Sequence, residues 1–202
     1  MKNISKITIL LFIILVTFSC VNKEDNSNIK LNNLENLKND NRFIELLNNK
    51  KTAITNIKDI EKAILLNEKE NLTENDVNEL VKALGFKNIE EYSKYINKEI
   101  KLELELENDY NISEIPLIDL ENLTISVLET GNLKKGDPCN CERMRINCIG
   151  IATSASIVGN IGCASLDIAI IPGIICHAAV LTAQYLASDS CNASAENCVS
   201  GC

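Results

Sequence analysis

Residues 139–202 read CNCERMRINCIGIATSASIVGNIGCASLDIAIIPGIICHAAVLTAQYLASDSCNASAENCVSGC, and their cysteines decide the fold class. Eight of the nine cysteines in the 202-residue chain lie in this stretch, and residues 21–138 contain none. The eight are Cys139, Cys141, Cys148, Cys163, Cys176, Cys191, Cys198 and Cys202. An even set in a short exported segment is typical of a disulfide framework, because so small a module buries too little apolar surface to be stable alone. We predict a disulfide-stapled module; eight cysteines allow 105 pairings, so the connectivity stays open.

A metal site or a nucleophile would be the alternative use of these cysteines. Zinc sites usually combine Cys-x₂₋₄-Cys pairs, whereas this stretch begins with Cys-x-Cys and continues with gaps of 12 to 14 residues. The sole histidine, His177, directly follows Cys176, and adjacent side chains on a helix point about 100° apart. We therefore interpret His177 as structural. We expect no catalytic residues, no metal and no cofactor, and we expect that the protein is not an enzyme.

The chain between Cys148 and Cys191 is almost uncharged. Asp167 is the only charged residue from 149 to 187, and Pro172-Gly173 divides this run into two arms. Each arm is shorter than the roughly 20 apolar residues of a membrane helix. We favour a buried helical hairpin; the alternative is a hairpin that inserts into a target membrane. The module has two arginines against four acidic residues, so it lacks the cationic excess of typical membrane-lytic peptides.

The N-terminus has the features of a lipoprotein signal peptide. Lys2 and Lys6 precede an apolar run, and residues 16–20 (VTFSC) resemble a bacterial lipobox. This implies a signal peptide over residues 1–19 and lipidation of Cys20, which would anchor the protein in the producer's membrane. The alternative is ordinary signal-peptidase cleavage near this point.

The residues after Cys20 continue this pattern. Lys-Glu-Asp at 23–25 resembles a signal that sends some lipoproteins to the cell surface. We therefore expect an exported outer-membrane or cell-surface lipoprotein. Residues 20–40 are rich in Asn and Lys with few apolar side chains, which predicts a flexible tether.

The acidity of the chain resides in its middle. Residues 21–138 contain 16 Lys and Arg against 24 Asp and Glu, and a surface this acidic repels nucleic acid. We expect no nucleic-acid partner. The acidic residues of section 41–130 have the spacing of a solvated helix face and do not converge on one point. Recognition or restraint is the role that we expect of this section.

The apolar spacing in the middle section predicts helices. Apolar residues recur every three or four positions from Phe43, Thr73 is a candidate N-cap, Gly85 is a candidate C-cap, and a further helix begins near Asn88. Residues 100–107 (IKLELELE) alternate as in a strand, but they are good helix formers and we favour a helix. The chain is predicted to be mainly α, with a small helical N-terminal section and a disulfide-stapled helical C-terminal module.

The order of cysteines and spacers in residues 139–202 resembles the halocin-C-eight-like (microhalocin type) bacteriocins. The resemblance rests on the first cysteine pair, the segment 147–150 (NCIG), an Ala/Ser/Gly-rich arm ending at Cys163, Ile171-Pro172 before Cys176, a Tyr185 arm leading to Cys191, and the tail 198–202 (CVSGC). The first pair here is Cys-x-Cys, and two cysteines of the family pattern are absent. Losing two cysteines implies one disulfide fewer than in the family.

In that family the cysteine-rich peptide is the antimicrobial agent, and the rest of the precursor is exported with it and confers immunity. The resemblance implies that section 41–130 is a propeptide and immunity section in contact with the module. It also implies that the linker 131–138 is cut, and we place the cut at Lys134-Lys135. A target-cell membrane or a receptor would be the partner of a module released to the medium. The alternative is a permanently surface-tethered, disulfide-stapled binding or structural module without killing activity.

Overall fold

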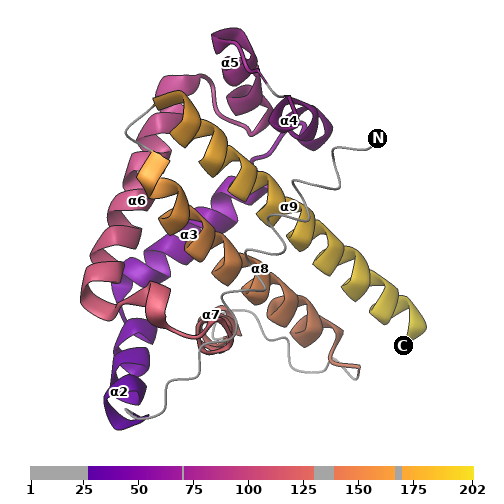
Figure 1. Ribbon diagram of the computed structural model, residues 1–202. Helices are drawn as coiled ribbons and strands as arrows, with labels where there is room; N and C mark the ends of the chain where they lie inside the picture. The colour runs from indigo at the N-terminus through magenta and orange to yellow at the C-terminus, as the bar shows by residue number, and fades with distance from the viewer. Residues whose placement is uncertain (1–26, 70, 130–138, 167–169) are drawn as a thin grey trace.

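The computed structural model describes residues 27–69, 71–129, 139–166 and 170–202, and all regular structure in these ranges is helical (Figure 1). The elements are α2 (Ser27–Lys38), α3 (Asn41–Thr55), α4 (Ile60–Asn67), α5 (Glu74–Ala83), α6 (Ile89–Tyr110), the 3₁₀ turn η1 (Ile112–Glu114), α7 (Leu117–Glu129), α8 (Cys141–Cys163), the 3₁₀ turn η2 (Ala164–Leu166) and α9 (Ile170–Gly201). The predicted fold class, mainly α with a helical C-terminal module, is confirmed.

The helix ends predicted from the sequence are also confirmed. Thr73 and Asp76 form a capping box at the start of α5: the Asp76 N–H donates to Thr73 Oγ1, and the Thr73 N–H donates to the Asp76 carboxylate at 2.9 Å. Gly85 follows α5 with a φ of 99°, a left-handed conformation that glycine adopts without strain. The side chain of Asn88 caps α6 by accepting from the Glu91 N–H at 2.9 Å.

Residues 100–107 belong to the helix α6, as we favoured, and the strand interpretation is wrong. Leu102 and Leu106 are buried, whereas Leu104 between them is 43% exposed. Residues four apart share one face of a helix and residues two apart do not, so only part of the alternating leucines can face the core. The inward face is completed by Glu99 and Glu103.

Part of the predicted tether is helical. Residues Ser27–Lys38 form α2, and Leu37 is fully buried in a cluster that also contains Phe43 and Leu46 of α3. The prediction of a flexible tether over residues 20–40 is therefore wrong for residues 27–38, because the helix places Leu37 against the core. Residues 20–26 lie outside the described residues.

The C-terminal stretch forms a hairpin of two long helices, α8 and α9, that lie side by side in Figure 1. We predicted that Pro172-Gly173 divides the arms, and this is wrong: α8 ends at Cys163, η2 follows, and α9 already begins at Ile170. Pro172 sits in the first turn of α9, where a backbone N–H would have no intrahelical partner, so proline is tolerated. We call α8, η2 and α9, together with the flanking Cys139 and Cys202, the hairpin, and α2 to α7 the N-terminal helices.

Two apolar clusters form the core, and the hairpin contributes to both. The first lies at the α4–α5 end and contains Ala53, Ala63, Val77, Leu80, Val81, Ala83, Leu84, Tyr92 and Ile96 together with Ile174, Ala178 and Leu181 of α9. The second contains Leu37, Phe43, Leu46, Leu47, Leu102, Leu106, Ile112, Leu120 and Leu123 together with Ile157 of α8. The linker at 131–138 thus separates two segments of sequence that share their buried apolar surface.

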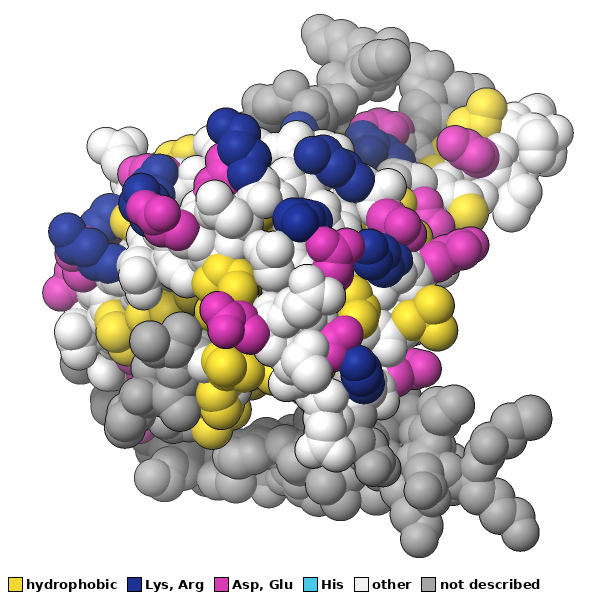
Figure 2. Space-filling model, turned by 90° about the horizontal axis from the view of Figure 1, so that it is seen from above, with side chains coloured by type: hydrophobic (Ala, Val, Ile, Leu, Met, Phe, Trp, Pro, Cys, Tyr) yellow, Lys and Arg dark blue, Asp and Glu magenta, His cyan; other side chains and the backbone are white. Residues whose placement is uncertain are grey.

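Charged side chains on the face seen in Figure 2 are mixed in sign, with Lys and Arg next to Asp and Glu. Lys62 pairs with Glu79 at 2.6 Å, and Lys82 pairs with the same carboxylate at 3.0 Å. These pairs are substantially exposed, so each contributes at most about 1 kcal/mol to stability. The net negative charge of the chain is therefore not gathered into one acidic patch on this face.

Two glycines of α8 give a matched test of how closely α7 packs on the hairpin. A Cβ at position 150 would lie 2.5 Å from Ile125 Cγ1 of α7, whereas a Cβ at position 162 would meet nothing within 4 Å. We expect Gly150→Ala to lower the free energy of unfolding by about 1–3 kcal/mol, because α7 must shift away. Gly162→Ala should raise it by about 0.5–1 kcal/mol through helix propensity. Denaturant unfolding of both variants checks this; equal effects would contradict the close α7–α8 contact.

Candidate functional site

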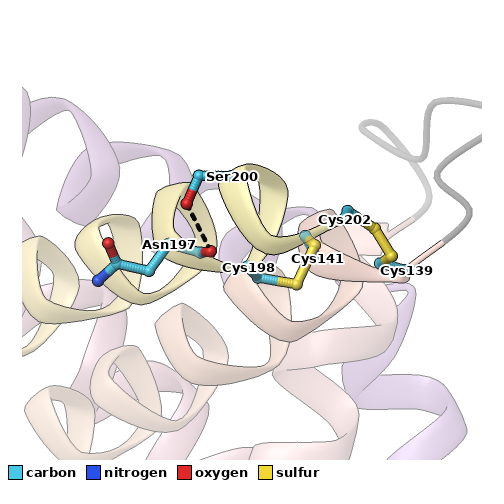
Figure 3. The surroundings of a disulfide bond; sticks show 6 residues. All are labelled: Cys139, Cys141, Asn197, Cys198, Ser200 and Cys202. Atoms are coloured by element: carbon cyan, nitrogen blue, oxygen red, sulfur yellow. Dashed lines mark hydrogen bonds between the residues drawn. A yellow bond between two sulfur atoms is a disulfide. The ribbon is translucent and has the colours of Figure 1, made fainter.

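The eight cysteines of the hairpin form four nested disulfides. The pairs are Cys139–Cys202, Cys141–Cys198, Cys148–Cys191 and Cys163–Cys176, with Cα–Cα distances of 6.2, 5.6, 5.6 and 5.7 Å. Each pair encloses the next, so α8 and α9 are joined at successive levels from their open end to the turn. Figure 3 shows the two outermost bonds side by side at the open end.

This pairing follows from helix periodicity. Counted outward from the turn, the cysteines of α8 stand 15 and then 7 residues apart (163, 148, 141), and those of α9 also stand 15 and then 7 apart (176, 191, 198). Seven residues make about two turns and fifteen make about four, so each set falls on one face of its helix. Two antiparallel helices with mirrored spacing place the sets opposite each other. This mirrored spacing was the signal in the sequence that resolves the connectivity we left open.

The other site residues predicted from the sequence do not lie in the described part of the chain. Cys20, the predicted lipidation site, and Lys134 and Lys135, the predicted processing site, are all outside the described residues. All eight module cysteines pair with one another, so no disulfide joins the hairpin to the N-terminal helices. Apart from the peptide chain itself, the hairpin is therefore held against those helices by noncovalent contacts.

The apolar part of this contact comes from one face of the hairpin. Ile157 of α8 is fully buried in the second cluster, and Ile174, Ala178 and Leu181 of α9 are at most 6% exposed in the first. Burying side chains of this size stabilises a structure by about 1.5–3 kcal/mol for each large residue. The contact between the hairpin and the N-terminal helices thus has the character of a protein core.

A chain of buried polar side chains runs through the middle of the same contact. Lys50 Nζ of α3 lies 2.9 Å from Glu103 Oε1 and 3.9 Å from Glu99 Oε2, both on α6. Asn160 Nδ2 of α8 donates to Glu103 Oε1 at 3.2 Å, and His177 Nδ1 of α9 lies 3.0 Å from Asn160 Oδ1. We call these five residues the buried polar cluster.

The cluster is almost completely removed from solvent. Lys50, Glu99, Glu103 and His177 are each 1% exposed and Asn160 is 7% exposed. Because Asn160 uses its amide N–H₂ toward Glu103, its Oδ1 must accept, and His177 therefore carries its proton on Nδ1 in this contact. Two members of the cluster belong to the hairpin and three to the N-terminal helices, so the cluster exists only while the two parts are docked.

Burial changes the acid–base properties of the cluster. Burial raises the pKa of the Glu99 carboxyl to about 7; Lys50 opposes this rise and the neighbouring Glu103 adds to it. Burial also raises the pKa of Tyr95, which lies beside Glu99. Neither oxygen of Glu99 accepts a well-formed hydrogen bond from the described residues. An ionised carboxylate at this position is therefore poorly compensated.

Sequence reasoning missed this cluster. We expected the acidic residues of section 41–130 to lie on a solvated face, and this is wrong for Glu99 and Glu103. The signal in the sequence was their position. Glu99 stands three residues after Ile96, and Glu103 stands three residues before Leu106, so both fall on the inward face of α6. His177 is buried and lies 3.0 Å from Asn160, and its structural role stays a prediction.

Further polar contacts join the two parts around the cluster. Asn67 Nδ2 of α4 donates to Thr182 Oγ1 of α9 at 3.0 Å. Ser154 Oγ of α8 donates to Thr124 Oγ1 of α7 at 2.9 Å, and both residues are fully buried. Thr153 and Ser156 instead donate to carbonyls of their own helix, each at 2.8 Å, so small polar residues of the hairpin are satisfied partly by the N-terminal helices and partly by the backbone of the hairpin.

The outward face of the hairpin retains apolar side chains in contact with solvent. Met144, Ile151 and Val158 stand seven residues apart on α8 and are 51%, 46% and 37% exposed. Both hairpin helices are long and apolar enough to cross a membrane, but 44% of the most apolar window of each is buried within the protein. Length and hydropathy alone do not separate such helices from the core helices of a soluble protein.

Comparison of the chain with protein-family models, with curated proteins and with solved structures finds no match. Among the described residues, no group of three or more His, Cys, Asp or Glu side chains is placed to hold a metal ion. The candidate functional site is therefore the hairpin itself together with the surface that the N-terminal helices cover.

Proposed function

We propose that the chain is an exported lipoprotein precursor whose hairpin is a bacteriocin-like antimicrobial peptide restrained by the N-terminal helices. The observation that carries this proposal is the disulfide map: all four bonds lie within the hairpin, and none reaches the N-terminal helices. A covalently closed unit held by noncovalent contacts is the arrangement that a releasable peptide needs.

One backbone cut is enough to free the hairpin in this scheme. Residues 131–138 connect α7 to the first disulfide, and Lys134-Lys135 would be the cleavage site. After the cut, four disulfides keep α8 and α9 together. Each typically stabilises the folded hairpin by about 2–4 kcal/mol, because it restricts the unfolded chain. A lipid on Cys20 would retain the N-terminal helices on the producer's surface, where they could bind the hairpin and confer immunity.

Release would expose the apolar surface that the N-terminal helices cover. Ile157, Ile174 and Leu181 would then join the apolar side chains already on the outward face of the hairpin. The module carries two arginines against four acidic residues, so attraction to an anionic membrane does not drive its binding. Its target contact would be apolar insertion into a membrane or binding to a receptor.

Intact-mass spectrometry of the medium and the membrane fraction of the native producer tests this proposal. The expected result is a free species of about 64–72 residues, eight mass units lighter than its reduced form because four disulfides remove eight hydrogens. Growth inhibition by that species would then be measured. Only full-length acylated protein in the membrane, with no killing on contact, would overturn the bacteriocin proposal.

The second candidate function is a permanently tethered binding or structural module. The sharing of both apolar clusters by the hairpin and the N-terminal helices favours it, because a core of this kind is costly to open. Mass spectrometry of the medium and the membrane fraction also distinguishes the two candidate functions. If the module is permanently tethered, residues 139–202 never leave the membrane fraction. A processed peptide in the medium excludes it.

A further inference from the structure

The buried polar cluster places two carboxyl groups, Glu99 and Glu103, around one lysine, Lys50. Among the described lysines and arginines, Lys50 alone lies within 4 Å of the two carboxyl groups. All three are 1% exposed, so bulk water would not screen the excess negative charge if both carboxyl groups were ionised. Burying an unbalanced charge costs several kcal/mol, and a buried group commonly becomes neutral instead.

The geometry distinguishes the two carboxyl groups. Glu103 Oε1 receives both the ammonium of Lys50 at 2.9 Å and the amide of Asn160 at 3.2 Å, which are partners suited to an ionised carboxylate. Glu99 lies farther from Lys50, at 3.9 Å, and its other polar neighbours, Asn49 of α3 and Tyr95 of α6, are uncharged and form no well-aligned hydrogen bond with its oxygens. The ionic pair is therefore Lys50–Glu103, and Glu99 is the group that neutralises.

We propose that Glu99 takes up a proton when the hairpin docks, so that the buried polar cluster is a proton-linked contact that holds the hairpin more weakly as the pH rises. This inference deepens the proposed function, because it names how the restraint of the hairpin would be regulated. The step is a simple proton transfer from solvent to the Glu99 carboxylate on docking, and its reverse on release. No other bond forms or breaks.

The groups that face Glu99 from each packed helix support this assignment. On α6 they are Tyr95, Glu103 and the more exposed Lys98, which pairs with Glu45 of α3 at 2.8 Å. The helix α3 adds Lys50 and the amide of Asn49, whereas Asn160 of α8 joins the cluster through Glu103, with His177 of α9 behind it. Burial is the largest influence on the Glu99 carboxyl, and it raises the pKa to about 7.

The direction of the pH effect follows from this rise. A carboxyl whose pKa is raised by docking contributes stability that is complete below its ordinary value, 4.5, and is lost as the pH passes through about 7. The docked state is therefore strongest in mild acid and loosens above neutrality. Asp40 and Asp76 behave in the opposite way, because hydrogen bonds lower the pKa of each to about 2, and their contribution is lost only in strong acid.

Unfolding of the oxidised full chain at several pH values between about 5.5 and 8 tests the proposal. The four disulfides keep the hairpin closed, so unfolding reports chiefly on the separation of the N-terminal helices from it. For the native chain we expect the unfolding equilibrium constant to rise about 10- to 30-fold over this range. Glu99→Gln imitates the neutral carboxyl and should reduce the rise to about threefold or less. Glu105→Gln, on the exposed side of α6, is the matched control and should keep the native rise.

Two additions make the result decisive. The imidazole of histidine ordinarily titrates in the same pH range, so His177→Gln, which can still hydrogen-bond to Asn160, separates its contribution. The infrared carbonyl band of a protonated carboxyl group in the native chain near pH 6 gives a test that needs no folded variant. Native pH dependence retained in Glu99→Gln, or absence of that band, would overturn the proposal. Neither the pH dependence of unfolding nor the infrared band depends on cleavage or killing. Failure of the proton-link proposal can therefore be distinguished from failure of the proposed bacteriocin function.

Discussion

Replacing Lys50 with methionine is expected to lower the free energy of unfolding by about 3–5 kcal/mol at pH 7. Lys50 is 1% exposed and holds Glu103 at 2.9 Å. Methionine has a similar length and fills the same space, so the loss comes from charge and not from a cavity. Glu103 would then be left buried without its cationic partner, and removing one partner of a buried ion pair typically costs about 3–5 kcal/mol.

Lys98→Met is the matched control for this effect. Lys98 makes an equally direct ion pair with Glu45 at 2.8 Å, but the two side chains are 56% and 47% exposed. Exposed pairs of this kind contribute at most about 1 kcal/mol. Denaturant unfolding of both variants at pH 7 gives the comparison. Similar small losses in both variants would contradict the buried ion pair.

Removing the Cys148–Cys191 disulfide by the double change Cys148→Ser and Cys191→Ser is expected to cost about 2–4 kcal/mol of unfolding free energy. This bond closes a separation of 43 residues and joins α8 and α9 between the innermost and the outer bonds. Without this bond, the unfolded chain between the Cys141–Cys198 and Cys163–Cys176 disulfides forms one undivided loop, which has more conformational entropy. Differential scanning calorimetry under oxidising conditions measures the loss.

The double change Cys139→Ser and Cys202→Ser is the control within the same hairpin. The Cys139–Cys202 bond spans a sequence separation of 63 residues, only six more than the Cys141–Cys198 bond inside it. Cys139 and Cys202 are both exposed. With Cys141–Cys198 in place, the terminal bond orders only these few residues, so we expect a smaller loss. An equal or larger loss from the terminal pair would contradict the nested arrangement.

Local physics explains why much of the fold was predictable. A capping box at Thr73, a glycine at position 85 and an asparagine cap at position 88 act over a few residues, and each appears where the sequence indicated it. The helical nature of residues 100–107 was likewise decided by their helix-forming composition. The arms of the hairpin were misplaced at Pro172 because proline is compatible with a first helical turn, and the sequence does not say whether a proline precedes or begins a helix.

The candidate site was predictable to a smaller extent. Cysteine composition indicated a disulfide-stapled module, and the mirrored spacing of 15 and 7 residues on the two arms contained the connectivity. The spacing identifies which cysteines pair only when the two arms are known to be antiparallel helices. The contact surface was not predictable, because it joins residues as far apart as Lys50 and His177 through side chains on four different helices.

The sequence by itself determined the helical class, the ends of α5, the start of α6 and the concentration of cysteine in residues 139–202, since these depend on short-range propensity and on composition. Only the tertiary structure decided which polar residues are inside. Glu99 and Glu105 have the same side chain on the same helix, yet one is buried beside Lys50 and the other borders solvent. The difference arises because Glu99 lies with Glu103 on the inward face of α6, to which α3 contributes Lys50 and α8 contributes Asn160, and burial sets both the cost of a charge and its response to pH.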